Sequence, residues 1–301
     1  MPQSPLTRSQ NVSWLRSISA PRLVEEWRRV FGIDITSELQ GVSTIEHYRC
    51  DDSGLEFFLP PGVAGSPLLY QGLQRFEWYY SSHGWELNLA ARDVRPCRHL
   101  LEVGSGAGAF VEQCQAAGIE AIGLETNPVA CQEANAHGIP TECLALSEYV
   151  RQGRPAVDAV CAFQVLEHLA DPLRFFEDCE AALRRRGLLL LSVPNADGYL
   201  RHCDDILDRP PHHMTRWSPA TFRRLEHFVP FRVEALAREP LAPNQVARFL
   251  DAQGSRFRAR RFLGRVAFNR CTLPALNRLL RVGFRNLFAG HSLYIRMRRL
   301  S

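Results

Sequence analysis

The sequence contains no lysine, so all 36 residues counted as lysine plus arginine are arginines. Contacts with a phosphate or a carboxylate must therefore use a guanidinium group or a backbone N–H rather than an ammonium group. The net charge of +4 is modest and does not single out the chain as a nucleic-acid-binding protein. We expect no nucleic-acid partner for the protein as a whole.

Acidic residues are missing from the C-terminal part of the chain, where residues 256–299 include twelve arginines and no aspartate or glutamate. Apolar residues recur there at three- and four-residue spacing, which predicts amphipathic helices. These residues are Phe262, Leu263, Val266, Leu276, Leu279 and Leu280. Three roles stay open for this segment: a solvated face over a dimer or lid surface, a helix on a membrane surface, or a clamp for an anionic substrate or nucleic acid.

Long apolar runs and paired cysteines are also missing. No apolar run approaches the roughly 20 residues needed to span a bilayer, and the N-terminus lacks the apolar segment of a signal peptide. Nine cysteines without paired spacing indicate reduced thiols rather than a disulfide framework. We expect a cytoplasmic monomer or homodimer, with peripheral contact to the inner face of the membrane through the arginine-rich segment as one alternative.

Changes of pattern divide the chain into four segments. Residues 1–94 mix a helical stretch with aromatic-rich irregular sequence and are interpreted as an N-terminal cap. Residues 95–240 alternate short apolar strands with helices, as in a parallel sheet covered on both faces, and form the expected catalytic core. Residues 241–290 are an arginine-rich helical insertion, and residues 291–301 return to the sheet as its last strand.

The core segment predicts a doubly wound α/β fold. Strands are predicted at residues 99–103, 119–124, 157–163, 188–193, 232–236 and 292–297. Helices are predicted at residues 110–117 and after Asn127 and Asp171, each of which can cap a helix that begins with proline. We expect the helix after Asp171 to include the arginines at 184–186 in its last turn and to stop at Gly187.

A glycine turn follows the first core strand, where residues 100–108 read L-L-E-V-G-S-G-A-G. Glycines allow a tight turn and a close approach of a ligand to the amides at the start of the next helix. Gly104, Gly106 and Ala109 fit the dinucleotide pattern, whereas Gly104, Gly106 and Gly108 after Glu102 fit the pattern of S-adenosylmethionine-binding enzymes. Glu125 ends the next strand, where a carboxylate can bind the ribose of either cofactor.

The segment F-Q-V-L-E-H-L at residues 163–169, followed by Asp171-Pro172, resembles the class I S-adenosylmethionine-dependent methyltransferases, in particular their small-molecule and glycan O-methyltransferase-like branch. The resemblance runs in register from residue 100 to about residue 195. It implies S-adenosylmethionine as the cofactor. It also implies a Rossmann-like, mostly parallel seven-stranded sheet with an antiparallel last strand.

The same resemblance implies roles for particular residues. Glu102 and the backbone of residues 104–108 would hold the amino-acid end of the cofactor, Glu125 the ribose, and Gln164 and Val165 would lie beside the sulfonium. The full set is Glu102, Gly104, Ser105, Gly106, Gly108, Glu125, Thr126, Asn127, Leu144, Gln164 and Val165, with Asn127 and Leu144 flanking the adenine. Tyr79 or Tyr80 could close over the sulfonium, or could pack in the core of the cap.

The acceptor side is expected in the loop D-R-P-P-H-H-M-T-R-W-S at residues 208–218, which resembles a P-H-H-x-x-x-W-S loop of this branch. His213 or His212 is the candidate general base, and His168 is a candidate contact to substrate or cofactor. The alternative is structural, with Ser218 starting a helix and one histidine anchoring the loop. We expect no metal ligands, because Ser53 stands where a zinc ribbon would need a second cysteine after Cys50, and a metal-free hairpin is expected there.

These observations predict an S-adenosylmethionine-dependent methyltransferase acting on an oxygen, and with less support a nitrogen, of a small molecule or glycan-type acceptor. Two alternatives remain: an NAD-dependent oxidoreductase, and a non-catalytic scaffold that keeps the methyltransferase fold at a membrane surface. The sequence does not identify the acceptor.

Overall fold

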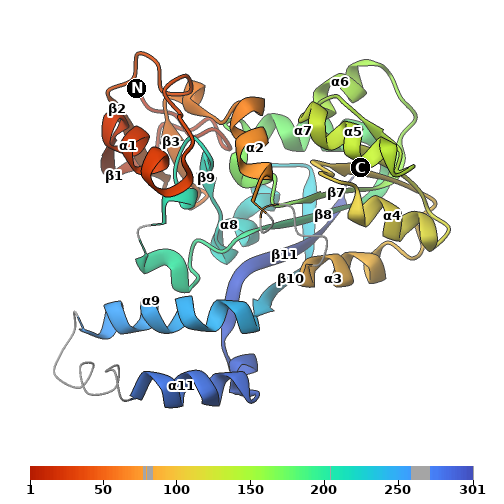
Figure 1. The fold of residues 1–301 in the computed structure, drawn as a ribbon. Helices are drawn as coiled ribbons and strands as arrows, with labels where there is room; N and C mark the ends of the chain where they lie inside the picture. The colour runs from red at the N-terminus through yellow and green to blue at the C-terminus, as the bar shows by residue number, and fades with distance from the viewer. Residues whose placement is uncertain (77–78, 80–83, 204, 259–271, 301) are drawn as a thin grey trace.

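The computed structural model describes residues 1–76, 79, 84–203, 205–258 and 272–300. Figure 1 shows an N-terminal sheet, a large central sheet flanked by helices, and a pair of long helices that projects from the central sheet. The projecting pair consists of α9 (Val246–Arg258) and α11 (Thr272–Arg281). None of the helices within these ranges is long and apolar enough to cross a membrane.

The central sheet has seven strands in the order β10-β11-β8-β7-β4-β5-β6. Its strands are β4 (His99–Val103), β5 (Glu120–Leu124), β6 (Thr141–Glu142), β7 (Val157–Phe163), β8 (Leu183–Pro194), β10 (Phe231–Pro240) and β11 (Ala289–Arg299). The five strands from β6 to β8 are parallel, and β11 runs antiparallel to both β8 and β10. The predicted Rossmann-like sheet with an antiparallel last strand is confirmed.

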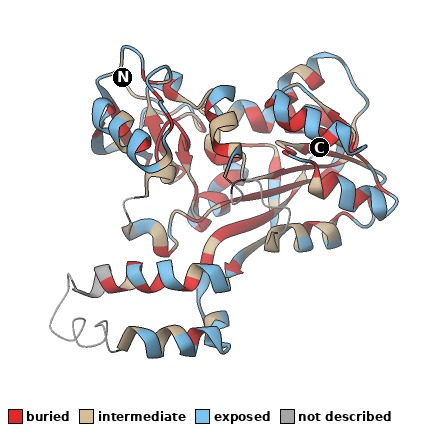
Figure 2. Ribbon diagram, in the orientation of Figure 1, coloured by how far each residue is buried: buried red, intermediate tan, exposed pale blue. Residues whose placement is uncertain are grey.

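Helices cover both faces of this sheet. They are α3 (Trp85–Asp93), α4 (Ala109–Ala116), α5 (Pro128–Ala136), α6 (Leu146–Arg151), α7 (Pro172–Ala182) and α8 (Pro219–Arg224). Leu189 of β8 belongs to an apolar cluster with Phe176 of α7, whereas the adjacent Leu190 belongs to a second cluster with Phe110 of α4. Because both faces are covered, the run of leucines is buried throughout, as Figure 2 shows for the central strands.

The predicted helix starts are confirmed by capping hydrogen bonds. The Asn127 side chain accepts from the Val129 amide at 3.1 Å, and the Asp171 carboxylate accepts from the Arg174 amide at 3.2 Å. Ser218 caps α8 in the same way, through the Thr221 amide at 3.1 Å. These bonds satisfy amides that have no partner inside the helix.

The predicted end of α7 is wrong. The helix ends at Ala182, and the arginines at 184–186 belong to the beginning of β8. Leu183 pairs with Val157 of β7, and the Arg184 guanidinium contacts Asp158 at 2.6 Å. Arginines before a glycine are typical of a helix end, but here the pairing with β7 determines the structure.

The N-terminal sheet is antiparallel and contains β1 (Val12–Ser19), β2 (Thr44–Cys50), β3 (Glu56–Leu59) and β9 (Thr215–Arg216), with α1 (Ala20–Phe31) and α2 (Pro67–Gln74) beside it. The hairpin expected after residue 48 is formed by β2 and β3. Strand β9 comes from the loop that carries the predicted histidines. Met214, just before β9, is buried in one apolar cluster with Trp27 and Phe58, so the N-terminal sheet fixes this loop.

The spacing of Leu276, Leu279 and Leu280 predicts a helix, and these residues lie in α11, whereas α9 precedes the residues of this pattern. Phe262, Leu263 and Val266 belong to residues 259–271, which lie outside the described residues. Phe249 and Leu250 of α9 and Leu280 of α11 form a small apolar cluster with Tyr199. Leu276 packs against this cluster, whereas Leu279 is exposed. The two helices therefore pack on the segment that follows β8.

Candidate functional site

A cavity of about 700 Å³ opens at the carboxyl ends of β4, β7 and β8. In open α/β sheets this edge is where ligands bind. Gly104, Ser105 and Gly106 line the cavity after β4, Gln164 lines it after β7, and Asn195 lines it after β8. Its opposite wall includes Asn244, Gln245 and Arg248, so the start of the arginine-rich segment is part of the same cavity.

The glycine turn has a left-handed backbone conformation that residues other than glycine adopt only with strain. Gly104, Gly106 and Gly108 have φ of +70°, +54° and +82°. A Cβ atom on Gly104 would lie 2.5 Å from Val165 Cγ2, because Val165 packs directly behind the turn. The turn therefore lines the cavity with its backbone while Val165 fills its other side, and the amides of Gly104 and Ser105 donate to the Leu124 carbonyl.

Glu125 holds this turn in place. Its carboxylate accepts hydrogen bonds from the amides of Gly106 at 2.9 Å, Thr126 at 2.7 Å and Asn127 at 2.8 Å. A carboxylate offers about four acceptor positions, so one remains for a ligand hydroxyl. Glu125 thus fixes the end of β5 against the turn after β4.

Glu102 is buried at the end of β4, and its Oε2 atom has no hydrogen-bond partner among the described residues. Burial raises the pKa of Glu102 to about 8, the charge of Glu125 raises this pKa further, and the Val111 amide opposes the shift. Glu102 also lines the cavity. The side chain is therefore mostly protonated at neutral pH and lacks the partner that a cationic group would supply.

The predicted cofactor residues fall into two groups. Glu102, Gly104, Ser105, Gly106, Gln164 and Tyr79 line the cavity, whereas Gly108, Glu125, Thr126, Asn127, Leu144 and Val165 do not. Helix α2 lies over part of the second group, because Asn127 Nδ2 donates to Gln74 Oε1 at 2.7 Å. Leu144 packs against the main apolar cluster.

Gln164 ends β7 in a left-handed backbone conformation with φ of +54°. Its amide donates to the Ser192 carbonyl at 2.9 Å, and its Nε2 atom donates to Ser192 Oγ at 3.1 Å. Such a conformation is strained in a residue other than glycine and persists where neighbouring contacts enforce it. Both bonds to β8 hold Gln164 at the cavity.

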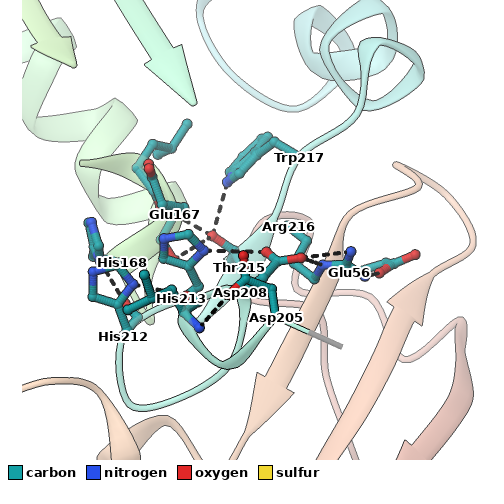
Figure 3. A network of polar contacts seen from close by, with 12 residues as sticks. Glu56, Glu167, His168, Asp205, Asp208, His212, His213, Thr215, Arg216 and Trp217 are labelled. Carbon is teal, nitrogen blue, oxygen red and sulfur yellow. Dashed lines mark hydrogen bonds and ion pairs between the residues drawn. The ribbon is translucent and has the colours of Figure 1, made fainter. Parts of the chain in front are cut away.

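His168, His212 and His213 form a cluster at the cavity (Figure 3). The centroid of the His212 ring lies 4.6 Å from that of His168 and 4.5 Å from that of His213. His168 ends the short helix Leu166–His168, and the other two histidines lie on the loop before β9. The structure therefore brings together the three histidines that the sequence singled out.

Hydrogen bonds between this short helix and the loop explain why the rings meet. The Met214 amide donates to the Glu167 carbonyl at 2.8 Å, and Thr215 Oγ1 donates to the Leu166 carbonyl at 3.1 Å. Trp217 Nε1 donates to Thr215 Oγ1 at 2.9 Å and closes the network. The loop is thus fixed directly after His213.

A chain of charged groups lies behind His213. His213 Nδ1 is 3.3 Å from Asp208 Oδ1, Arg216 Nε donates to Asp208 Oδ2 at 2.9 Å, and Arg216 Nη1 donates to Glu56 at 2.6 Å. Burial opposes ionisation of Asp208, but His213 and Arg216 hold its pKa below the ordinary value. Sequence reasoning missed Glu56, because it lies in the N-terminal sheet far from Arg216 along the chain.

Burial keeps two of the histidines neutral. It lowers the pKa of His168 to about 3, with the charge of His213 adding to the shift, and it lowers the pKa of His212 well below the usual value. Both side chains can accept a hydrogen bond or bind a cation through an unprotonated ring nitrogen.

Glu167 is a further buried residue of the cavity that the sequence analysis quoted within the F-Q-V-L-E-H-L segment but did not assign to the site. Neither carboxyl oxygen has a hydrogen-bond partner within the described part of the chain. Burial raises the pKa of Glu167 to about 8, and the charges of Asp208 and Glu86 add to this shift.

Tyr79 lies against the histidine cluster, where its hydroxyl is 3.1 Å from His212 Nε2. Tyr80, the other aromatic residue expected near the sulfonium, lies outside the described residues.

Residues 46–239 match the family model described as a methyltransferase domain. The chain belongs to this methyltransferase family. S-adenosylmethionine is the cofactor of this methyltransferase, in agreement with the glycine turn and with relatives named after this cofactor. The oxidoreductase alternative is not favoured.

This methyltransferase is 30% identical over 115 residues to the ubiquinone biosynthesis O-methyltransferase of Parvibaculum lavamentivorans, a match that covers 36% of this chain and 45% of the relative. It is 35% identical over 100 residues to a Mycobacterium tuberculosis protein named "Probable S-adenosylmethionine-dependent methyltransferase", covering 33% of this chain and 36% of that one. The chain thus spans less than half the length of these curated relatives.

Among solved structures, the methyltransferase aligns with the complex between the Trm112 methyltransferase activator and a methyltransferase from Haloferax volcanii. The TM-score is 0.50 at 16% identity, and the alignment covers 72% of this chain and 90% of the other. At this identity the likeness shows a shared fold.

Proposed function

We propose that this methyltransferase transfers the methyl group of S-adenosylmethionine to a hydroxyl oxygen of a small polar molecule or a glycan-type acceptor. The observation that carries the proposal is the shared cavity: the glycine turn lines one side and the histidine cluster another. A hydroxyl needs a group that takes its proton, and imidazole is suited to this near neutral pH. The relatives named O-methyltransferase support transfer to oxygen.

The residues around the glycine turn fit this cofactor. Glu102 offers a buried carboxyl oxygen without a hydrogen-bond partner for the ammonium group, and the backbone of the turn lines the cavity where the rest of the amino-acid end would lie. Glu125, which is bonded to the Gly106 amide of this lining, keeps one acceptor position for a ribose hydroxyl. When bound, S-adenosylmethionine supplies an activated methyl group. Gln164 and Tyr79 would border this part of the cavity and exclude water from it.

His213 would take the proton of the acceptor hydroxyl at Nε2. Its Nδ1 faces Asp208, so the Asp208 carboxylate stabilises the imidazolium that results. Arg216 favours the ionised form of Asp208 and orients it, and Glu56 holds the Arg216 guanidinium in place. Arg201, Asn244 and Arg248 line the rest of the cavity and can donate hydrogen bonds to hydroxyl or anionic groups of the acceptor.

The proposal is tested by incubating the protein with S-adenosylmethionine carrying an isotopically labelled methyl group and with metabolite and glycan fractions. We expect release of S-adenosylhomocysteine and a labelled methoxy carbon in the product, identified by NMR. A product methylated on nitrogen would contradict the oxygen acceptor. Binding of S-adenosylhomocysteine without turnover on any fraction would favour the non-catalytic scaffold.

Cofactor binding is expected to strengthen as the pH rises toward 8. The pKa of Glu102 is raised to about 8 in the empty site, so most molecules must lose this proton before the carboxylate can pair with the ammonium group of the ligand. For a pKa of about 8, the ionised fraction rises about fivefold between pH 7 and pH 8. Isothermal titration with S-adenosylhomocysteine at several pH values measures the resulting decrease in Kd.

Glu102→Gln is the matched control for this pH dependence, because it keeps the shape of the side chain and removes its titration. The variant should bind more weakly at pH 8 and show a nearly flat Kd between pH 7 and pH 8. An unchanged slope in the variant would assign the pH dependence to another group.

We further infer that the enzyme is cytoplasmic and that the end of α11 contacts anionic lipid at the inner membrane face. Val282 and Leu287 are 75% and 77% exposed, and Arg278 and Arg281 are exposed beside them. An apolar surface with adjacent arginines is suited to a negatively charged bilayer.

Sedimentation with lipid vesicles tests this contact. The protein should sediment with phosphatidylglycerol vesicles but not with phosphatidylcholine vesicles, and Val282→Asp should abolish its binding to the former.

A further inference from the structure

The three histidines of the cluster lie close together, although proton transfer needs only one of them. One ring nitrogen from each of His168, His212 and His213 lies within 4.8 Å of one ring nitrogen from each of the other two. The three residues come from two segments that are separated by more than forty positions, and the network around Thr215 holds these segments together. All three rings line the cavity.

The hydrogen bonds of the rings fix which nitrogen carries the proton. His168 Nδ1 is 2.6 Å from the His212 carbonyl oxygen, and His212 Nδ1 is 2.9 Å from the Leu207 carbonyl oxygen. His213 Nδ1 faces the Asp208 carboxylate. Carbonyl and carboxylate oxygens only accept, so each Nδ1 donates and each Nε2 carries a lone pair, which in His212 accepts from the Tyr79 hydroxyl at 3.1 Å.

Histidines that bind metals in proteins show this pattern. Their second ring nitrogen donates to a backbone carbonyl or a carboxylate, which fixes the tautomer and the ring orientation. Here all three histidines have such an acceptor, and Asp208 with His213 forms the carboxylate–histidine arrangement typical of metal sites.

The geometry points to a metal site in which His168, His212 and His213 bind one divalent transition-metal ion, of which Zn²⁺ fits best, with a fourth position open to the cavity. Three neutral imidazoles suit zinc, whereas Mg²⁺ and Ca²⁺ prefer oxygen ligands. Zinc–nitrogen bonds of about 2.0–2.1 Å require nitrogens about 3.4 Å apart, so nitrogens that lie within 4.8 Å would approach one another by up to about 1.4 Å. The Tyr79 hydroxyl would leave His212 Nε2 when the ion binds.

The metal site also suggests how the acceptor is activated, and this part rests on the proposed function. The open fourth position of the ion would bind the acceptor hydroxyl. A bound cation lowers the pKa of a hydroxyl, so its proton passes to solvent without the need for His213 as a base. The oxygen then forms the bond to the methyl carbon as the carbon–sulfur bond breaks, with S-adenosylhomocysteine as the leaving group.

The test uses the untagged full chain, treated with EDTA and dialysed. Titration with ZnCl₂ should give one tight site, and CoCl₂ should give the ligand-field absorption of a four-coordinate ion. His168→Ala and His213→Ala should each lose this site, whereas His227→Ala, which removes an exposed histidine on the surface, should keep it. Asp208→Asn should weaken metal binding by about 10- to 100-fold, because it weakens the support of His213 and of Arg216 without removing a ligand of the ion.

Binding of S-adenosylhomocysteine and circular dichroism report whether each variant is folded. The metal site is overturned if the folded wild-type chain binds no stoichiometric zinc or cobalt, or if His213→Ala and Asp208→Asn bind these ions as tightly as wild type. Methylation at an unchanged rate by metal-free enzyme would overturn the role of the ion while leaving the proposed function intact. Stoichiometric metal binding without methylation of any acceptor would support the site and count against the proposed function.

Discussion

Gly106→Arg is expected to abolish the binding of S-adenosylhomocysteine, with a loss of at least about a hundredfold in affinity, equivalent to about 2.7 kcal/mol or more. Gly106 has φ of +54°, and its amide donates to Glu125 Oε2 at 2.9 Å. An arginine would carry a long side chain at the wall of the cavity where the cofactor approaches the backbone. It would also strain the turn by about 1–3 kcal/mol.

Gly118→Arg separates the effect of strain from the effect of the side chain in the cavity. Gly118 has a similar φ of +80°, but a Cβ atom there meets nothing within 4 Å, and the residue lies on the surface after α4. This control should lose some stability and keep its affinity for S-adenosylhomocysteine. Isothermal titration measures the affinity of both variants. Equal losses of affinity would show that the close approach of the cofactor to Gly106 is not the cause of the weaker binding.

The juxtaposition of the glycine turn and Glu125 could be predicted because both follow consecutive strands of the sequence. The turn at residues 104–108 and Glu125 belong to consecutive strands, and parallel strands place their carboxyl ends at one edge. The helix starts at Asn127 and Asp171 could also be predicted from local sequence, because a capping residue followed by proline marks each of them. Local rules decide these features, and no distant residue changes them.

The acceptor side depends on long-range contacts that no local pattern contains. Glu56 reaches Arg216 because β9 pairs with β3, and Asn244 reaches the cavity because α9 packs on the segment around Tyr199. The predicted end of α7 was wrong for the same reason. Leu183 pairs with β7, and this pairing outweighs the helix-end signal of the arginines at 184–186 and Gly187. The sequence could name the histidines but not what surrounds them.

His213→Ala is expected to lower kcat by about 10²–10⁴-fold and to leave the affinity for S-adenosylhomocysteine unchanged. His213 lines the cavity, and its ring contacts the rings of His168 and His212. The loss is expected whether the imidazole takes the proton or holds a metal ion, because both roles act on the acceptor hydroxyl. Steady-state kinetics with an identified acceptor, together with titration of the cofactor product, measure the two effects separately.

His227→Ala is the matched control, because it removes an exposed imidazole that does not line the cavity. Its kcat should equal that of the wild type. If His213→Ala also kept full turnover, the cluster would have only a structural role. The chain from Glu56 through Arg216 and Asp208 would then serve to fasten the loop to the N-terminal sheet, since the same bonds that orient an imidazole also tie β9 to β3.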